Sequence, residues 1–147
     1  MENLEVIFKN IEVSEIDLLL EQLKFDTDNI RRSHFYKEGK DIGYSELDNL
    51  EKYFSTPGTG NLFVKYLDIG IKIPDVMLIL SFDKKYGDIT LNFPEENILF
   101  EETAKAEKEK IIKNKMRKIL ELIEMTSIIF GYEPAEDTDM LIFELEK

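Results

Sequence analysis

Hydrophobic and polar positions alternate with a period of two near the start of the chain, where Leu4, Val6 and Phe8 share one face. This alternation predicts a β-strand. Between residues 16 and 24 the leucines and isoleucines recur at helical spacing and predict a first helix. Residues 25–44 have no sustained period, so we expect a long, partly ordered connection there.

Residues 61–100 have the alternation and the continuous apolar runs of β-strands, and a short capped helix is expected before them, over 45–54. The phase of the alternation slips near Tyr66, so a bulge or bend is expected there. The pattern predicts an antiparallel meander of three strands, with turns at Pro74-Asp75 and at 83–88, over residues 61–73, 76–82 and 89–93.

The segment from Glu101 to Phe130 lacks Pro and Gly, and Gly131 follows it as a natural helix stop, so one long helix is predicted. A last strand is expected from Met140 to Leu145. The predicted architecture is one α+β domain over residues 1–147, in the order β-α-α-β-β-β-α-β. It has a mostly antiparallel sheet of about five strands with helices packed on one face.

The chain has 147 residues, of which 43% are hydrophobic and 34% charged, as expected for one folded domain. Its 31 acidic residues exceed its 19 basic ones, giving a net charge of −12. This field repels nucleic acids and anionic membranes and attracts basic partners, although such acidity also serves solubility. Without a signal peptide or a long apolar segment, the expected location is the cytoplasm.

No stretch of the chain carries the motif of a specific chemistry. The absence of Cys excludes disulfides, thiolate nucleophiles and Cys-ligated metals. The only histidine, His34, has no evident partner, the G-x-G at 58–60 completes no phosphate-binding motif, and the calcium-loop pattern that begins at Asp26 fails downstream. We therefore expect neither an enzyme nor a bound cofactor.

Charge is unevenly distributed near the C-terminus. The stretch from Lys105 to Lys118 is basic and could contact phosphate, but a solvated helix face is the simpler interpretation. Four acids then follow Gly131 closely. They could bind a hard metal ion, yet adjacent acids in one loop usually repel each other into water, so a partner-facing or solvated turn is expected. These acids are Glu133, Glu136, Asp137 and Asp139.

The sequence GYEPAEDTDMLIFEL, Gly131 to Leu145, follows the predicted long helix in a small, acidic, cysteine-free α+β chain. In this the chain resembles the immunity proteins of bacterial polymorphic toxin systems, in particular those of LXG-type toxins. The resemblance implies that it binds and neutralises a cognate toxin protein, expected to be basic. Oppositely charged surfaces would speed that association.

Aromatic residues are frequent anchors of protein interfaces, so the predicted partner-binding set combines aromatic residues with the C-terminal acids. Three alternatives stay open: an acidic, nucleic-acid-mimicking inhibitor of a DNA- or RNA-handling enzyme, an enzyme of unrecognised type, and a structural or assembly subunit. His34 is a further candidate anchor. The predicted partner-binding residues are Phe35, Tyr36, Tyr86, Tyr132, Glu133, Glu136, Asp137 and Asp139.

Overall fold

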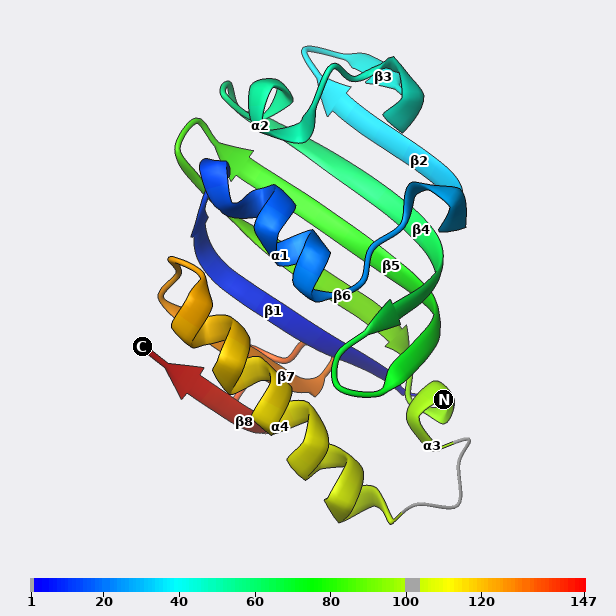
Figure 1. Ribbon diagram of the computed structural model, residues 1–147, viewed down its shortest axis with the longest axis vertical. Coiled ribbons are helices and arrows are strands. Elements are labelled where there is room, and N and C mark those ends of the chain that lie inside the picture. Colours follow the sequence, from blue (N-terminus) through cyan, green and yellow to red (C-terminus); the bar gives the residue numbers. More distant parts are fainter. Residues whose placement is uncertain (1, 100–103) are drawn as a thin grey trace.

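The computed structural model describes residues 2–99 and 104–147, and its main feature is one eight-stranded sheet (Figure 1). The strand order is β3-β2-β4-β5-β6-β1-β7-β8, and each neighbouring pair is antiparallel. The strands are β1 (Asn3–Glu12), β2 (Ile30–Lys37), β3 (Lys40–Ile42), β4 (Gly58–Asp68), β5 (Lys72–Asp83), β6 (Tyr86–Pro94), β7 (Ser127–Tyr132) and β8 (Leu141–Glu146).

Three of the four described α-helices lie against the same face of this sheet, which is the face turned toward the viewer in Figure 1. Leu19 of α1, Leu50 of α2 and Met116 of α4 join one core cluster with the inward residues of the strands. Each such fully buried side chain contributes about 1.5–3 kcal/mol relative to exposure. The helices are α1 (Ile16–Gln22), α2 (Leu50–Tyr53), α3 (Glu96–Leu99) and α4 (Lys105–Leu122).

The predicted sheet of about five strands in the order β-α-α-β-β-β-α-β is wrong, and one reason lies in residues 25–44. This segment forms β2 and β3, joined by a two-residue turn at Glu38 and Gly39, both with positive φ. Turns of this kind suit the twist of a hairpin, and Gly is favoured in them. The strands were missed because most of their side chains are polar on both faces, and only Phe35 is fully buried, so no apolar alternation shows.

A second correction concerns the long helix, whose predicted residues 101–103 lie outside the described part of the chain. The helix ends at Leu122 instead of Phe130, and Ile123 is already extended. The following residues form β7, which pairs with β1 on one side and β8 on the other. The β-branched residues Ile128 and Ile129 favour a strand. Pairing with β1 and β8 therefore ends the helix early, although no Pro or Gly precedes Gly131.

The β4–β5 hairpin differs from the prediction at its turn. β5 runs through Pro74 and Asp75, and the chain reverses near Gly70, which has φ +106. The phase slip expected near Tyr66 is present, because Lys65 and Tyr66 are both exposed between buried neighbours. The short helix expected over 45–54 is reduced to the single turn of α2, preceded by a 3-10 turn over Tyr44–Glu46.

Candidate partner-binding surface

Among the described residues, no helix lies on the side of the sheet opposite the core (Figure 1). Residues paired across antiparallel strands place their side chains on the same face, so the register identifies the side chains on this side. The apolar residues Phe63, Met77 and Ile79 are only partly buried there. We call the following set the open face: Arg32, His34, Tyr36, Asn61, Phe63, Met77, Ile79 and Thr90.

Side chains of the open face contact one another on β2 and β4. The Arg32 guanidinium lies 4.3 Å from the centroid of the Phe63 ring, a cation–π arrangement. The His34 and Tyr36 rings stack with centroids 6.2 Å apart. On the neighbouring β3, an Asp41 carboxylate oxygen lies 3.3 Å from His34 Nδ1. These contacts orient the polar and aromatic side chains at the β2 edge.

The segment 133–140, which we call the acidic loop, covers the neighbouring part of the same side of the sheet. Ala135 is fully buried against Ile7 and Ile129, forming a small cluster separate from the main core. The Ala135 N–H also donates to a Glu5 carboxylate oxygen at 3.0 Å. The register connects this cluster to the open face along one cross-strand row: His34, Asn61, Ile79, Thr90, Ile7 and Ile129.

Lys9 fastens the acidic loop to the sheet. Its ammonium lies 3.2 Å from an Asp88 carboxylate oxygen and 3.4 Å from one of Glu136. Burial by itself lowers the pKa of Lys9, but the hydrogen bonds and charges of Asp88 and Glu136 outweigh it, so the pKa is raised above its ordinary value. Asp88 is held further by the backbone N–H of Asn10 at 2.8 Å. The loop therefore has a defined position beside the open face.

The acids of the loop differ in their contacts. Glu133 accepts a hydrogen bond from the Asn3 side-chain amide at 3.4 Å, and Asp137 accepts one from the Asp139 backbone N–H at 3.3 Å. Within residues 2–99 and 104–147, no group of three or more acidic or His side chains is arranged to hold a metal ion. The loop thus presents exposed carboxylates at the border of a partly apolar surface.

The structure separates the predicted aromatic anchors. Phe35 is fully buried beneath α2, packed against Tyr53 and Phe54, so its side chain is not available to a partner. Tyr36 is 43% exposed on the open face, and Tyr86 is 42% exposed at the tip of the β5–β6 hairpin.

Tyr132 lies at the other end of the sheet from Tyr86 and ties the start of α4 to the strands. Its hydroxyl donates to a Glu95 carboxylate oxygen at 3.1 Å and accepts from the Lys105 ammonium at 2.8 Å. The hydrogen bond to Tyr132 is the main reason why the pKa of Lys105 is raised. The local network gives Tyr132 a structural role next to the acidic loop.

A comparison with protein families gives one decisive match. The model of the PABL017 Cdi1I immunity protein family matches residues 2–147. The chain belongs to this family. As a member of it, the chain is an immunity protein that binds and neutralises a bacterial toxin. The match confirms the resemblance to the immunity proteins of bacterial toxin systems, and the matched family is Cdi1I, not an LXG-type family.

A solved structure shares the fold of this immunity protein. One chain of the 1.75 Å crystal structure of the toxic C-terminal tip of CdiA from Pseudomonas aeruginosa in complex with immune protein superposes with a TM-score of 0.75. The two chains are 19% identical, and the match covers 98% of this chain and 94% of the other. A comparison with curated proteins finds no match. None of the described helices is both long and apolar enough to cross a membrane.

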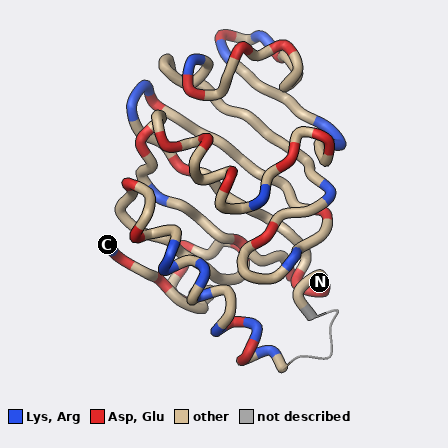
Figure 2. Tube along the Cα trace, in the orientation of Figure 1, with Lys and Arg blue, Asp and Glu red and all other residues tan. Residues whose placement is uncertain are grey.

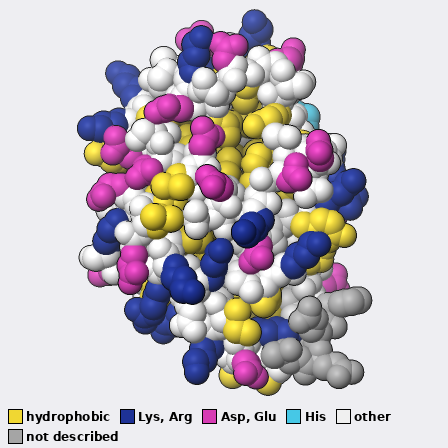
Figure 3. Space-filling view, in the orientation of Figure 1, with side chains coloured by type: hydrophobic (Ala, Val, Ile, Leu, Met, Phe, Trp, Pro, Cys, Tyr) yellow, Lys and Arg dark blue, Asp and Glu magenta, His cyan; other side chains and the backbone are white. Residues whose placement is uncertain are grey.

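Charges on the immunity protein are spread over many elements. Acidic residues occur on α1, on several loops and near the C-terminus, whereas Lys and Arg gather over α4 on the helix-covered face (Figures 2 and 3). Lys108 departs from the expected solvated stripe, because it is buried and donates to the Ile98 carbonyl oxygen. The basic stretch therefore serves packing as well as solvation.

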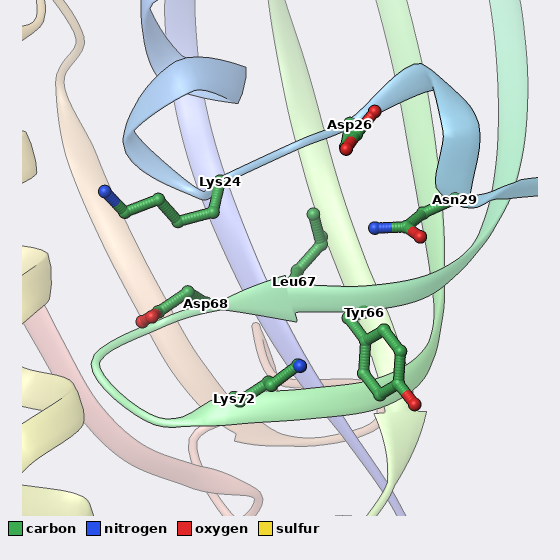
Figure 4. Close-up of a pocket in the computed structure, with 7 residues that line it drawn as sticks. All are labelled: Lys24, Asp26, Asn29, Tyr66, Leu67, Asp68 and Lys72. Carbon is green, nitrogen blue, oxygen red and sulfur yellow. The ribbon is translucent and has the colours of Figure 1, made fainter.

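A shallow hollow of about 300 Å³ lies between the chain that follows α1 and the end of β4 (Figure 4). Its two carboxylates shape local turns: Asp26 accepts from the Asp28 backbone N–H at 2.9 Å, and Asp68 from that of Gly70 at 2.7 Å. The Lys72 ammonium lies 4.1 Å from the Tyr66 ring centroid. These contacts give Asp26 and Asp68 a role in forming turns and place Lys72 against the Tyr66 ring.

Sequence reasoning missed the part of the open face formed by Arg32, Phe63, Met77 and Ile79. Phe63 occupies the outward parity of a strand whose inward parity the alternation identified. Met77 and Ile79 fall in an apolar run that predicted a strand covered on both sides. The sequence feature that could have indicated the open face is the presence of large apolar residues at outward-facing positions of antiparallel strands.

Proposed function

We propose that this immunity protein neutralises one cognate toxin domain by forming a stoichiometric complex with it and catalyses no reaction itself. The observation that carries the proposal is the match of the Cdi1I immunity family over residues 2–147. We further propose that the partner is a toxic C-terminal tip comparable to that of CdiA, and that the complex forms in the cytoplasm. An inhibitor of this kind needs a rigid, complementary surface and no nucleophile or cofactor.

The net charge of −12 supports a basic toxin surface as the partner. Opposite charges raise the rate of encounter more than they raise the final affinity. The exposed acids Glu136 and Asp137 belong to a loop anchored through Ala135 and Lys9, so their position is set before binding. We therefore propose the acidic loop as the element that steers the toxin.

Nucleic-acid mimicry receives less support. A mimic would carry its acids in one stripe at about phosphate spacing, whereas the acids here are distributed over many elements (Figure 2).

The test is a tagged pull-down from a lysate of the native organism, washed at low and high salt, with bound proteins identified by mass spectrometry. We expect one toxin, recovered through its C-terminal domain, that forms a 1:1 complex and loses its toxic activity when bound. A toxin that stays active inside the complex would contradict the proposal, as would a tagged protein that binds no toxin at either salt concentration.

Charge reversal tests the steering role of the acidic loop. The double variant Glu136→Lys, Asp137→Lys should slow association with the toxin domain, and the effect should shrink at high salt. The matched control is Glu21→Lys, Glu51→Lys, which makes the same change in net charge at exposed positions of α1 and α2. Equal slowing in both variants would assign the effect to net charge and remove the loop from the interface.

A further inference from the structure

We propose that the open face is the centre of the toxin interface and that the acidic loop forms part of its rim. This inference rests on the proposed function, because its occupant is the cognate toxin domain. The toxin surface that fits it has an apolar centre and basic residues along the side that meets the loop.

The first argument is the apolar content of the open face. Phe63 and Met77 are direct cross-strand partners, and Ile79 follows Met77 on the same side of β5. All three are only partly buried, and no described helix covers them. The solvent side of an antiparallel sheet ordinarily alternates to polar residues. Three large apolar side chains together there serve the core little and suit a surface that becomes buried on binding.

The second argument is residue type and order. Interface hot spots are rich in Arg and Tyr, and Arg32 and Tyr36 flank the apolar residues on β2. Arg32 already lies over the Phe63 ring, so its planar guanidinium has little rotamer freedom to lose when a partner packs on it. These side chains stand on the strands of a continuous sheet, which holds them rigidly.

The third argument is continuity with the acidic loop. The row that passes through Ile79 and Thr90 continues into Ile7 and Ile129, which the loop covers. Asp88 and Glu136 meet on Lys9 at this border, so carboxylates line the side of the open face toward β1. A polar, charged rim beside an apolar centre is the usual arrangement of a specific interface. Charge complementarity therefore favours a basic toxin domain as the occupant over a second acidic copy of this chain.

Alanine variants test the assignment with the toxin domain identified by the pull-down. Phe63→Ala and Ile79→Ala should each weaken binding at least about 30-fold, the loss typical of a hot spot. The matched control is Leu122→Ala, which removes an apolar side chain that is 52% exposed on α4. It should change the affinity less than about 3-fold. Urea unfolding of each variant checks that it remains folded under the binding conditions.

A label provides a readout that does not depend on the stability of the alanine variants. The chain has no Cys, so Asn61→Cys on the open face or Lys118→Cys on α4 carries a single environment-sensitive fluorophore. Addition of toxin domain should shift the emission of the label at position 61 and leave that at 118 unchanged. Analytical sedimentation of the protein without toxin should show no dimer that depends on Phe63, so wild type and Phe63→Ala should sediment alike.

The outcomes separate the two proposals. If the wild-type protein binds and inhibits the toxin while Phe63→Ala and Ile79→Ala bind as tightly, or if only the label at position 118 responds, the open face is not the interface and the proposed function stands. A dimer lost in Phe63→Ala would assign the face to a second copy of the chain and overturn the inference. If no toxin binds the wild-type protein, the proposed function itself fails, and this inference fails with it.

Discussion

The two faces of β5 place apolar side chains in opposite situations. Leu78 and Leu80 point toward the helices and are fully buried, whereas Met77 and Ile79 point to the other side and are partly exposed. All four residues are apolar and adjacent in sequence. The difference in burial therefore comes from what covers each side of the sheet.

This contrast separates the stabilisation of the fold from a surface for binding. Burial against α1, α2 and α4 removes apolar area from water within the chain, so the covered face contributes directly to folding stability. Apolar area that stays exposed contributes less to folding and leaves free energy to be gained when a partner covers it. The neighbours Leu80 and Ile79 allow the most direct comparison of the two faces, because they lie next to each other on β5 and point to opposite sides.

Truncation of these two neighbours should reduce the folding stability to very different extents. Leu80→Ala should lower the free energy of unfolding by about 2–5 kcal/mol, because it leaves a cavity in the core. Ile79→Ala should lower it by less, about 1–2 kcal/mol, because Ile79 is only partly buried and its truncation leaves no enclosed cavity. Urea unfolding at equilibrium measures both. Equal losses would show that the open face is as important to folding as the covered one.

Gly131 lies near the end of β7, just before the acidic loop, and a substitution there tests how tightly β7, β8 and the loop are packed together. A Cβ there would lie 2.5 Å from the Met140 carbonyl oxygen and 3.0 Å from Leu141 Cα. Gly131→Ala must shift β8 or the end of the loop, and we expect a loss of about 1–3 kcal/mol in unfolding free energy. Thermal or urea unfolding tests this.

Gly43→Ala is the control, because its Cβ would make ordinary contacts, the nearest at 3.6 Å to Ser33 Oγ. It should change the unfolding free energy by no more than about 0.5 kcal/mol. A Gly131→Ala protein as stable as this control would mean that the junction of β7, β8 and the acidic loop adapts freely.

The same comparison explains what the sequence could predict. Inward alternation in β1, β4 and β6 was visible because each inward position is apolar and each outward one mostly polar. β2 and β7 were hidden for opposite reasons. In β2 only Phe35 is fully buried, and Ser33 and Lys37 on the same side are polar, whereas β7 is apolar on both faces because the main core covers one face and the acidic loop covers the other. Such strands form because they pair with segments far away in the sequence, and the local periodicity does not reveal these pairings.

The partner-binding residues divide in a similar way. The acids after Gly131 can be identified from the sequence, because their density is a local feature of it. Phe35 lies among polar and aromatic residues in the sequence, which favours an interface anchor, yet the register turns its side chain into the core. Phe63 and Ile79 become a surface only when β4 and β5 are placed side by side. Location on one face requires the sheet register, which composition and spacing do not contain.

Tyr132 and Tyr86 lie at opposite ends of the sheet, and removal of their hydroxyl groups should affect stability differently. Tyr132→Phe removes a hydroxyl that bonds both Glu95 and Lys105, so we expect a loss of about 1 kcal/mol in unfolding free energy. Tyr86→Phe changes an exposed tip and should alter it by less than about 0.5 kcal/mol. Urea unfolding at neutral pH measures both. A larger effect at Tyr86 would contradict the structural role assigned to Tyr132.

The smallest expected effect belongs to Lys9, which connects the acidic loop to the open side of the sheet. Lys9→Met keeps most of the side-chain stem but removes the ion pairs with Asp88 and Glu136, so we expect a loss of about 0.2–1 kcal/mol at pH 7. Because folding raises the pKa of Lys9, the stabilisation is fully present below its ordinary pKa of 10.5 and is lost as the pH rises through the raised value. The stability difference between wild type and Lys9→Met should therefore stay constant up to about pH 9 and shrink above 10.5.

Lys118→Met makes the same change in net charge at an exposed position of α4 and controls for the overall repulsion of this acidic chain. Its stability difference from wild type should be near zero at every pH. If the Lys9→Met difference instead grew with rising pH, or if the two variants behaved alike, the ion pairs of Lys9 would not hold the loop. The acidic loop would then depend on Ala135 and the Glu5 carboxylate for its position beside the open face.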